Sequence, residues 1–160
     1  MLPIILLSVF GIVMLFLGFL KSRAVLLPAA LLFLLVSLIA TFADWNQSFM
    51  YFNDMLLNNN LAMVFTAIVL LSAFLVVAMS GSFIDDEFAQ PAEYYGLLLF
   101  SLVGAIMMIS FENLIMLFVG VEILSVSMYV LTGSDKSNSR SNEAALKYFL
   151  MGAFATGIML

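Results

Sequence analysis

The chain has 160 residues, of which 65% are hydrophobic and 9% are charged, with five basic and ten acidic side chains and a formal net charge of -5 at pH 7. A soluble domain is nearer to half apolar and a quarter charged, so these few charges exclude soluble globular enzymes and nucleic-acid-binding modules. The absence of Cys and His excludes disulfide bonds, zinc sites, thiolate-bound iron–sulfur clusters and histidine-ligated haem on this chain.

Long apolar stretches follow one another along the whole sequence, and each is about as long as a helix that crosses a hydrocarbon core about 30 Å thick. In chain order they cover about residues 2–20, 24–43, 61–80, 94–111, 113–132 and 143–160. Continuous apolar runs, rather than a two-residue alternation, favour helices over the strands of an outer-membrane barrel. The sequence therefore predicts an all-α, polytopic membrane helix bundle with about six transmembrane helices, in one membrane region over residues 1–160.

The polar residues lie mostly between the predicted helices. The connection over residues 81–93 is expected to be an acidic loop that holds Asp85, Asp86, Glu87, Pro91 and Glu93.

Four of the basic residues lie in two other connections, namely Lys21 and Arg23 in the first and Lys136 and Arg140 in the last. The positive-inside rule then places these connections in the cytoplasm and the amino terminus outside. The final stretch, up to Leu160, carries no basic flank, turn cluster or polar tail. We therefore expect the sequence to be the amino-terminal part of a longer protein.

Glu122 is an acidic residue in the middle of a predicted transmembrane helix. At about 1.5 Å per residue it lies about 15 Å from either end of that helix. An acidic residue at this depth costs about 2.5 to 3.5 kcal/mol to insert, and such groups face protein or a water-filled cavity. Ser125, Gly120 and Ser127 are small or polar neighbours that would admit water. Glu122 is therefore a candidate proton carrier, and the alternative is a structural residue that is hydrogen-bonded to a neighbouring helix.

Lys147 is the second charged residue inside a predicted span. It follows Glu143 by four residues, so the two side chains can form a surface pair, and a lysine only about 6 Å along the helix can extend its ammonium to the cytoplasmic interface. Alternatively, Lys147 couples to Glu122, which is expected to lie roughly 9 Å deeper. Two unit charges about 4 Å apart attract by about 4 kcal/mol at an effective dielectric near 20, enough to switch Glu122 between holding and releasing a proton. Both interpretations stay open.

Two sequence stretches are similar to a known family. The first runs from Glu112 to Ser125, contains the letters LFVGVEILS and is followed by Tyr129-Val130-Leu131. The second, EAALKYFLMGA, runs from Glu143 to Ala153. Together they resemble subunit N of the proton-pumping NADH-quinone oxidoreductase, respiratory complex I.

The resemblance implies an antiporter-like, proton-translocating membrane subunit with about fourteen helices in inverted repeats, of which this chain would hold the first ones. It also implies that Glu122 matches the proton-channel glutamate of the fifth helix and that Lys147 matches the lysine of the second stretch. The family's partner lysines on later helices have no counterpart here, so the chain alone is expected to be inactive.

Other parts of the complex are implied as well. NADH, quinone, FMN and iron–sulfur clusters would be bound by partner subunits, with no cofactor on this chain. The implied partners are the other membrane subunits of complex I and the lipid bilayer, with no nucleic acid, and the implied location is the bacterial inner membrane. Two alternatives remain: a subunit of a related multi-subunit cation/proton antiporter, and a non-catalytic membrane scaffold in which Glu122 titrates without any link to transport.

Overall fold

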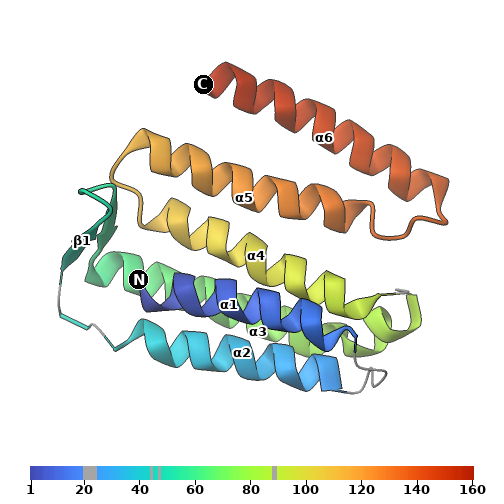
Figure 1. Cartoon of the computed structure of the whole chain (residues 1–160), viewed down its shortest axis with the longest axis horizontal. Helices are drawn as coiled ribbons and strands as arrows, with labels where there is room; N and C mark the ends of the chain where they lie inside the picture. The colour runs from blue at the N-terminus through green and yellow to red at the C-terminus, as the bar shows by residue number, and fades with distance from the viewer. Residues whose placement is uncertain (20–24, 44, 47, 88–89) are drawn as a thin grey trace.

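The computed structural model describes residues 1–160 except 20–24, 44, 47 and 88–89, and within these described residues the fold is mostly helical (Figure 1). The elements in chain order are α1 (Leu2–Leu17), α2 (Leu26–Thr41), β1 (Phe49–Tyr51), β2 (Leu56–Asn58), α3 (Asn60–Glu87), α4 (Pro91–Ile109), α5 (Leu114–Thr132) and α6 (Ser139–Met159). The helical fold class predicted from the apolar stretches is thus confirmed. Lys21 and Arg23, on which the predicted orientation partly depends, lie outside the described residues.

The helices lie side by side with their axes roughly parallel to the long axis of the molecule. Figure 1 shows α1, α2, α3 and α4 grouped together, with α5 beside α4 and α6 beside α5. The end of α1 and the connection between α5 and α6 lie at one end of the bundle, and the β1–β2 hairpin covers the other end. The chain therefore forms a four-helix group that is extended on one side by two further helices.

The buried core is shared by the first four helices. Its fully or almost fully buried members are Leu7 and Met14 of α1, Leu26, Ala30 and Leu34 of α2, Leu70 and Val77 of α3, and Ala92, Tyr95, Leu99, Leu102, Val103 and Ile106 of α4. By contrast, α6 is described along its whole length and has no buried residue. The apolar side chains of α6 are therefore available to lipid or to protein outside this chain.

Two glycines allow α4 and α5 to approach each other closely. A Cβ atom added at Gly104 of α4 would lie 2.5 Å from the backbone nitrogen of Leu124 and 2.6 Å from the carbonyl oxygen of Gly120. A Cβ at Gly120 would in turn lie 3.1 Å from the carbonyl oxygen of Gly104. Small residues at such contacts bring helix backbones together, and here they fix which face of α5 is turned toward α4.

The hairpin before α3 is joined to the connection between α4 and α5. Its strands are antiparallel, with Tyr51 opposite Leu56, and Leu56 also forms a bridge to Phe111. The Leu57 N–H donates to the Ser110 carbonyl at 2.8 Å, and the Glu112 N–H donates to the Met55 carbonyl at 3.0 Å. The hairpin is therefore held over the bundle end by backbone hydrogen bonds.

The predicted acidic loop over residues 81–93 is wrong. The backbone of α3 continues to Glu87, so Asp85 and Asp86 belong to a helix, while Pro91 and Glu93 form the first turn of α4. The physical reason is that no proline interrupts the chain between Ser80 and Glu87, whereas Pro91 occupies the first helical turn, where its missing N–H costs nothing.

Helix length bears on the number of membrane crossings. In the described part of the chain, three helical segments are long and apolar enough to span a bilayer, and they are Asn60–Gly81, Pro91–Ile109 and Leu114–Thr132. The helices α1 and α2 are apolar but have 16 residues each. At about 1.5 Å per residue this is about 24 Å, less than the hydrocarbon thickness. The count of six transmembrane helices stays a prediction.

Candidate functional site

Glu122 lies near the middle of α5 and is half-buried. Its side chain borders an open hollow that is also lined by Phe100, Ile123, Val126 and Ser127. The carboxyl group is therefore not sealed in the packed core of this chain. A carboxyl that borders an open hollow can exchange a proton with any water that enters there.

The packing of α5 on α4 explains this position. Gly120 faces α4, and at 3.6 residues per turn a side chain two residues later points about 200° away around the helix. Glu122 is consequently directed away from the Gly104–Gly120 contact. The ring of Phe100 supplies an apolar wall of the hollow, and it is itself fixed against α1, because a Cβ at Gly11 would lie 3.1 Å from its Cζ atom.

The two serines near Glu122 use their hydroxyl protons within α5. The Ser125 hydroxyl donates to the Val121 carbonyl and lies 3.5 Å from the Glu122 carbonyl oxygen. The Ser127 hydroxyl donates to the Ile123 carbonyl at 2.9 Å. Because a hydroxyl has one proton and two lone pairs, these serines offer only acceptor oxygens to a water near Glu122.

Lys147 forms a pair on the exposed side of α6. Its Nζ atom lies 2.6 Å from Glu143 Oε1, and the side chains of Lys147 and Glu143 are 70% and 62% exposed. Both residues are described, as is Glu122, and among them the structure records this pair and no ion pair between Lys147 and Glu122. The sequence allowed a surface pair with Glu143, and that arrangement is the one present here.

A tyrosine joins the helices that carry the two candidate residues. The ring of Tyr129, on α5, meets Tyr148 edge-on with ring centroids 4.7 Å apart, and meets Phe149 with centroids 5.7 Å apart. A Cβ at Gly152 would lie 2.6 Å from Tyr129 Cζ and would overlap its hydroxyl oxygen. The role of Tyr129 was missed in the sequence, where only the small-residue spacing around Gly152 indicated close packing.

The connection between α5 and α6 is ordered by local hydrogen bonds. The Ser137 hydroxyl donates to Asp135 Oδ1 at 2.6 Å, and this bond lowers the pKa of Asp135 below its ordinary value. The Asn138 side chain caps α6 by accepting from the Arg140 N–H at 3.0 Å. The Ser141 hydroxyl donates to the Thr132 carbonyl at 2.7 Å, which ties the start of α6 to the end of α5.

Metal binding has no support in the described residues, which contain no group of three His, Cys, Asp or Glu side chains placed to hold an ion. The chemistry that the arrangement offers is that of one carboxylic acid within an apolar helix pair and one ammonium on the adjacent helix.

Comparison with known proteins gives matches over nearly the whole chain. Residues 112–160, which contain both Glu122 and Lys147, match the family model described as NADH:quinone oxidoreductase/Mrp antiporter, TM. NADH-quinone oxidoreductase subunit N of Flavobacterium psychrophilum is 35% identical over 157 residues, which are 98% of this chain and 34% of that protein. Subunit N of Cytophaga hutchinsonii is 39% identical, with 98% of this chain and 34% of that protein covered. The chain spans about a third of the length of these curated relatives.

Solved structures agree with the sequence matches. A chain of respiratory complex I from Thermus thermophilus with bound aureothin superposes with a TM-score of 0.79 at 28% identity, covering 97% of this chain and 34% of that one. A chain of the membrane-bound sulfane sulfur reductase, an archaeal respiratory membrane complex, gives a TM-score of 0.74 at 21% identity, with 98% and 34% covered. The second likeness concerns the fold alone.

Proposed function

Because this chain belongs to the family of NADH-quinone oxidoreductase subunit N, we propose that the protein is a proton-translocating membrane subunit of an NADH:quinone oxidoreductase. In this proposal, other subunits bind NADH, FMN, the iron–sulfur clusters and quinone, and the protein works in contact with other membrane subunits. The relatives named subunit N, at 35% and 39% identity, are the observation that carries the proposal.

Glu122 is proposed to carry the proton. Two observations support this role: the side chain lies midway along α5, and it borders an open hollow instead of the packed core. Water in the hollow would deliver a proton to the carboxylate and later remove it. Each charge moved against a potential of 100 mV costs about 2.3 kcal/mol, so the release step must be coupled to the redox reaction.

Lys147 is proposed to act as the charge partner of Glu122. In the structure its ammonium is paired with Glu143 and not with Glu122, and this is one position of the proposed scheme. When the ammonium turns toward Glu122, the carboxylate is favoured and the proton leaves. A lysine side chain has four rotatable carbons, and the exposure of Lys147 leaves it free to move, which supports this two-position scheme.

The orientation is proposed from charge. Lys136 and Arg140 at the connection of α5 and α6, together with the bases of the first connection, would face the cytoplasm. The amino terminus and the hairpin end would then face the outside of a bacterial inner membrane.

The test is Glu122→Gln in the intact complex. Proton uptake driven by NADH oxidation would be followed in inside-out membrane vesicles with a pH-sensitive dye. We expect uptake to fall at least severalfold with the complex still assembled, because glutamine keeps the size and hydrogen bonding of glutamate but cannot release a proton. The matched control is Glu112→Gln, an exposed acid two residues before the same helix, which should pump normally.

Full pumping by the Glu122→Gln complex would reject the carrier role and leave the scaffold interpretation. The family model also covers Mrp antiporters. Co-purification of the protein with flavin and iron–sulfur subunits distinguishes the oxidoreductase from a cation/proton antiporter.

A further inference from the structure

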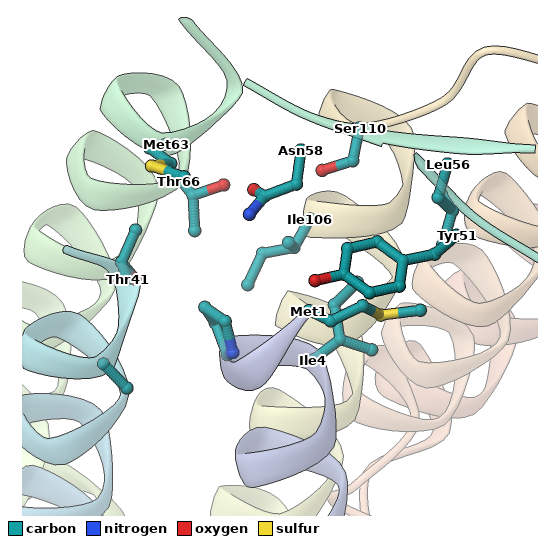
Figure 2. A pocket seen from close by; sticks show the side chains of 12 residues that line it. Met1, Ile4, Thr41, Tyr51, Leu56, Asn58, Met63, Thr66, Ile106 and Ser110 are labelled. Carbon is teal, nitrogen blue, oxygen red and sulfur yellow. The ribbon is translucent and has the colours of Figure 1, made fainter. Parts of the chain in front are cut away.

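A small cavity lies at the end of the bundle that the hairpin covers. It is partly open and is lined by the start of α1, the end of α2, the hairpin, the start of α3 and the end of α4, and its volume is about 20 Å³ (Figure 2). A cavity needs about 10 to 15 Å³ to hold one water molecule, and the water needs two to four polar partners. The volume is therefore sufficient for one water molecule, and the polar side chains that line the cavity decide whether a water binds there.

Five polar side chains line this cavity, and two of them are already engaged: the Thr41 hydroxyl donates to the Ser37 carbonyl, and Tyr51 has an interaction of its own. The other three reach the cavity from three different elements. They are Thr66 of α3, Asn58 of β2, and Ser110, which caps α4. Thr66 is 3% exposed and Ser110 is 8% exposed. Figure 2 shows the oxygen atoms of Thr66 and Ser110 directed toward the space beside the Asn58 amide.

The hydroxyls of Thr66 and Ser110 differ from the other helical hydroxyls nearby. Ser37 donates to the Phe33 carbonyl at 2.8 Å, Thr41 to the Ser37 carbonyl at 2.9 Å, and Ser72 to the Ile68 carbonyl at 2.8 Å. Such a bond to the preceding turn satisfies a hydroxyl within an apolar helix.

Within the part of the chain that the structure describes, no such bond is made by Thr66 or Ser110, and the Asn58 side chain also has no hydrogen-bond partner. A buried polar group that forgoes its bond to the helix is costly unless something else satisfies it. Thr66 and Ser110 are two groups of this kind, and the half-buried Asn58 side chain lines the same cavity.

We propose that this cavity is a binding site for a single water molecule that links α3, the hairpin and α4. The water would accept from one hydroxyl and donate to the Asn58 carbonyl oxygen and to the other hydroxyl. The hairpin is already joined to Ser110 through the Leu57 N–H. The water would add a hydrogen-bonded link from the hairpin to Thr66 of α3, beside the existing link to Ser110 at the end of α4.

The reporter for the test is hydrogen exchange of the Leu57 amide in the assembled complex, because this amide is released when the hairpin opens. Thr66→Val keeps the shape of the side chain and removes one partner of the water. We expect exchange at Leu57 to become about fivefold faster, the factor that follows from losing one ordinary hydrogen bond. Thr66→Ser, which keeps the hydroxyl, and Ser72→Ala, which removes a hydroxyl bonded to its own helix, should both exchange like the unchanged protein.

A cavity without water would give a different rate of hydrogen exchange at Leu57. If the cavity is dry, Thr66→Val removes an unpaired hydroxyl, and exchange at Leu57 will be unchanged or slower. Either result would overturn the proposal. If the Thr66→Val complex does not assemble, Ser110→Ala provides the same comparison. A density map of the unchanged complex that resolves ordered water elsewhere must also show a peak within hydrogen-bond distance of the Thr66 and Ser110 oxygens, and an empty cavity in such a map would refute the proposal.

Discussion

The ring of Tyr129 lies against the backbone of α6 at Gly152, so close that a Cβ atom there would be 2.6 Å from Tyr129 Cζ. Tyr129 follows Glu122 by seven residues on α5, which is two helical turns and nearly the same face. Gly152 follows Lys147 on α6 by little more than one turn. This contact therefore sets the spacing between the two helices that carry the proposed proton carrier and its charge partner.

Gly152→Ala is expected to disrupt that spacing. The added methyl group must displace the Tyr129 ring or push α6 away, and forced overpacking of this kind costs about 1 to 3 kcal/mol. Thermal stability of the subunit and NADH-driven proton uptake should both fall. Gly157→Ala is the matched control, since a Cβ at Gly157 has no atom within 4 Å and alanine is the better helix former. Equal behaviour of the two variants would contradict a role for the Tyr129 contact.

Lys147→Ala is expected to lower proton uptake, but less than Glu122→Gln does. The carboxyl would still carry a proton and would lose only the movable charge that assists its release. Stability should change little, because exposed ion pairs such as Lys147–Glu143 contribute about 0 to 1 kcal/mol. The measurement is proton uptake per assembled complex. If only the amount of inserted complex decreases while each complex pumps normally, Lys147 is an interfacial anchor and not a charge partner.

The connection between α5 and α6 is expected to loosen in acid. The Ser137 hydroxyl holds the pKa of Asp135 below its ordinary value of 3.8. A carboxyl whose pKa is lower in the folded state contributes stability above its unfolded pKa and loses it as the pH falls through the folded value. Hydrogen exchange over residues 133–139 should therefore be unchanged near neutral pH and should accelerate below pH 3.8.

Ser137→Ala is the matching variant for this connection. It removes the first cause of the lowered pKa, so acceleration should begin at a higher pH than in the unchanged protein. The same onset in both proteins would show that the Ser137 hydroxyl does not stabilise the Asp135 carboxylate.

The sequence predicts those parts of this fold that depend on local apolar character. Long runs without charge specify helices in lipid, because no other open structure satisfies the backbone there. The position of Glu122 along its helix follows from the same reasoning, since counting residues gives its distance from each end of the helix.

The sequence does not predict the contacts between helices or between the hairpin and the helices. The hairpin depends on hydrogen bonds to Ser110 and Glu112, which are distant in sequence, and its turn has left-handed backbone at Phe52, with φ of 55°. The next two residues, Asn53 and Asp54, share this conformation and are of types that favour it, whereas a phenylalanine gives no sequence signal for it. The Tyr129–Gly152 contact was equally hidden, because it depends on how α5 and α6 are rotated about their axes.

The helix that carries Lys147 has no buried residue, and among the described residues it packs mainly against α5. A detergent that separates α6 from α5 would move the Lys147 ammonium away from the Glu122 carboxyl before either helix unfolds. Under the proposed function, such a preparation should therefore lose NADH-driven proton uptake while it keeps its full circular dichroism signal.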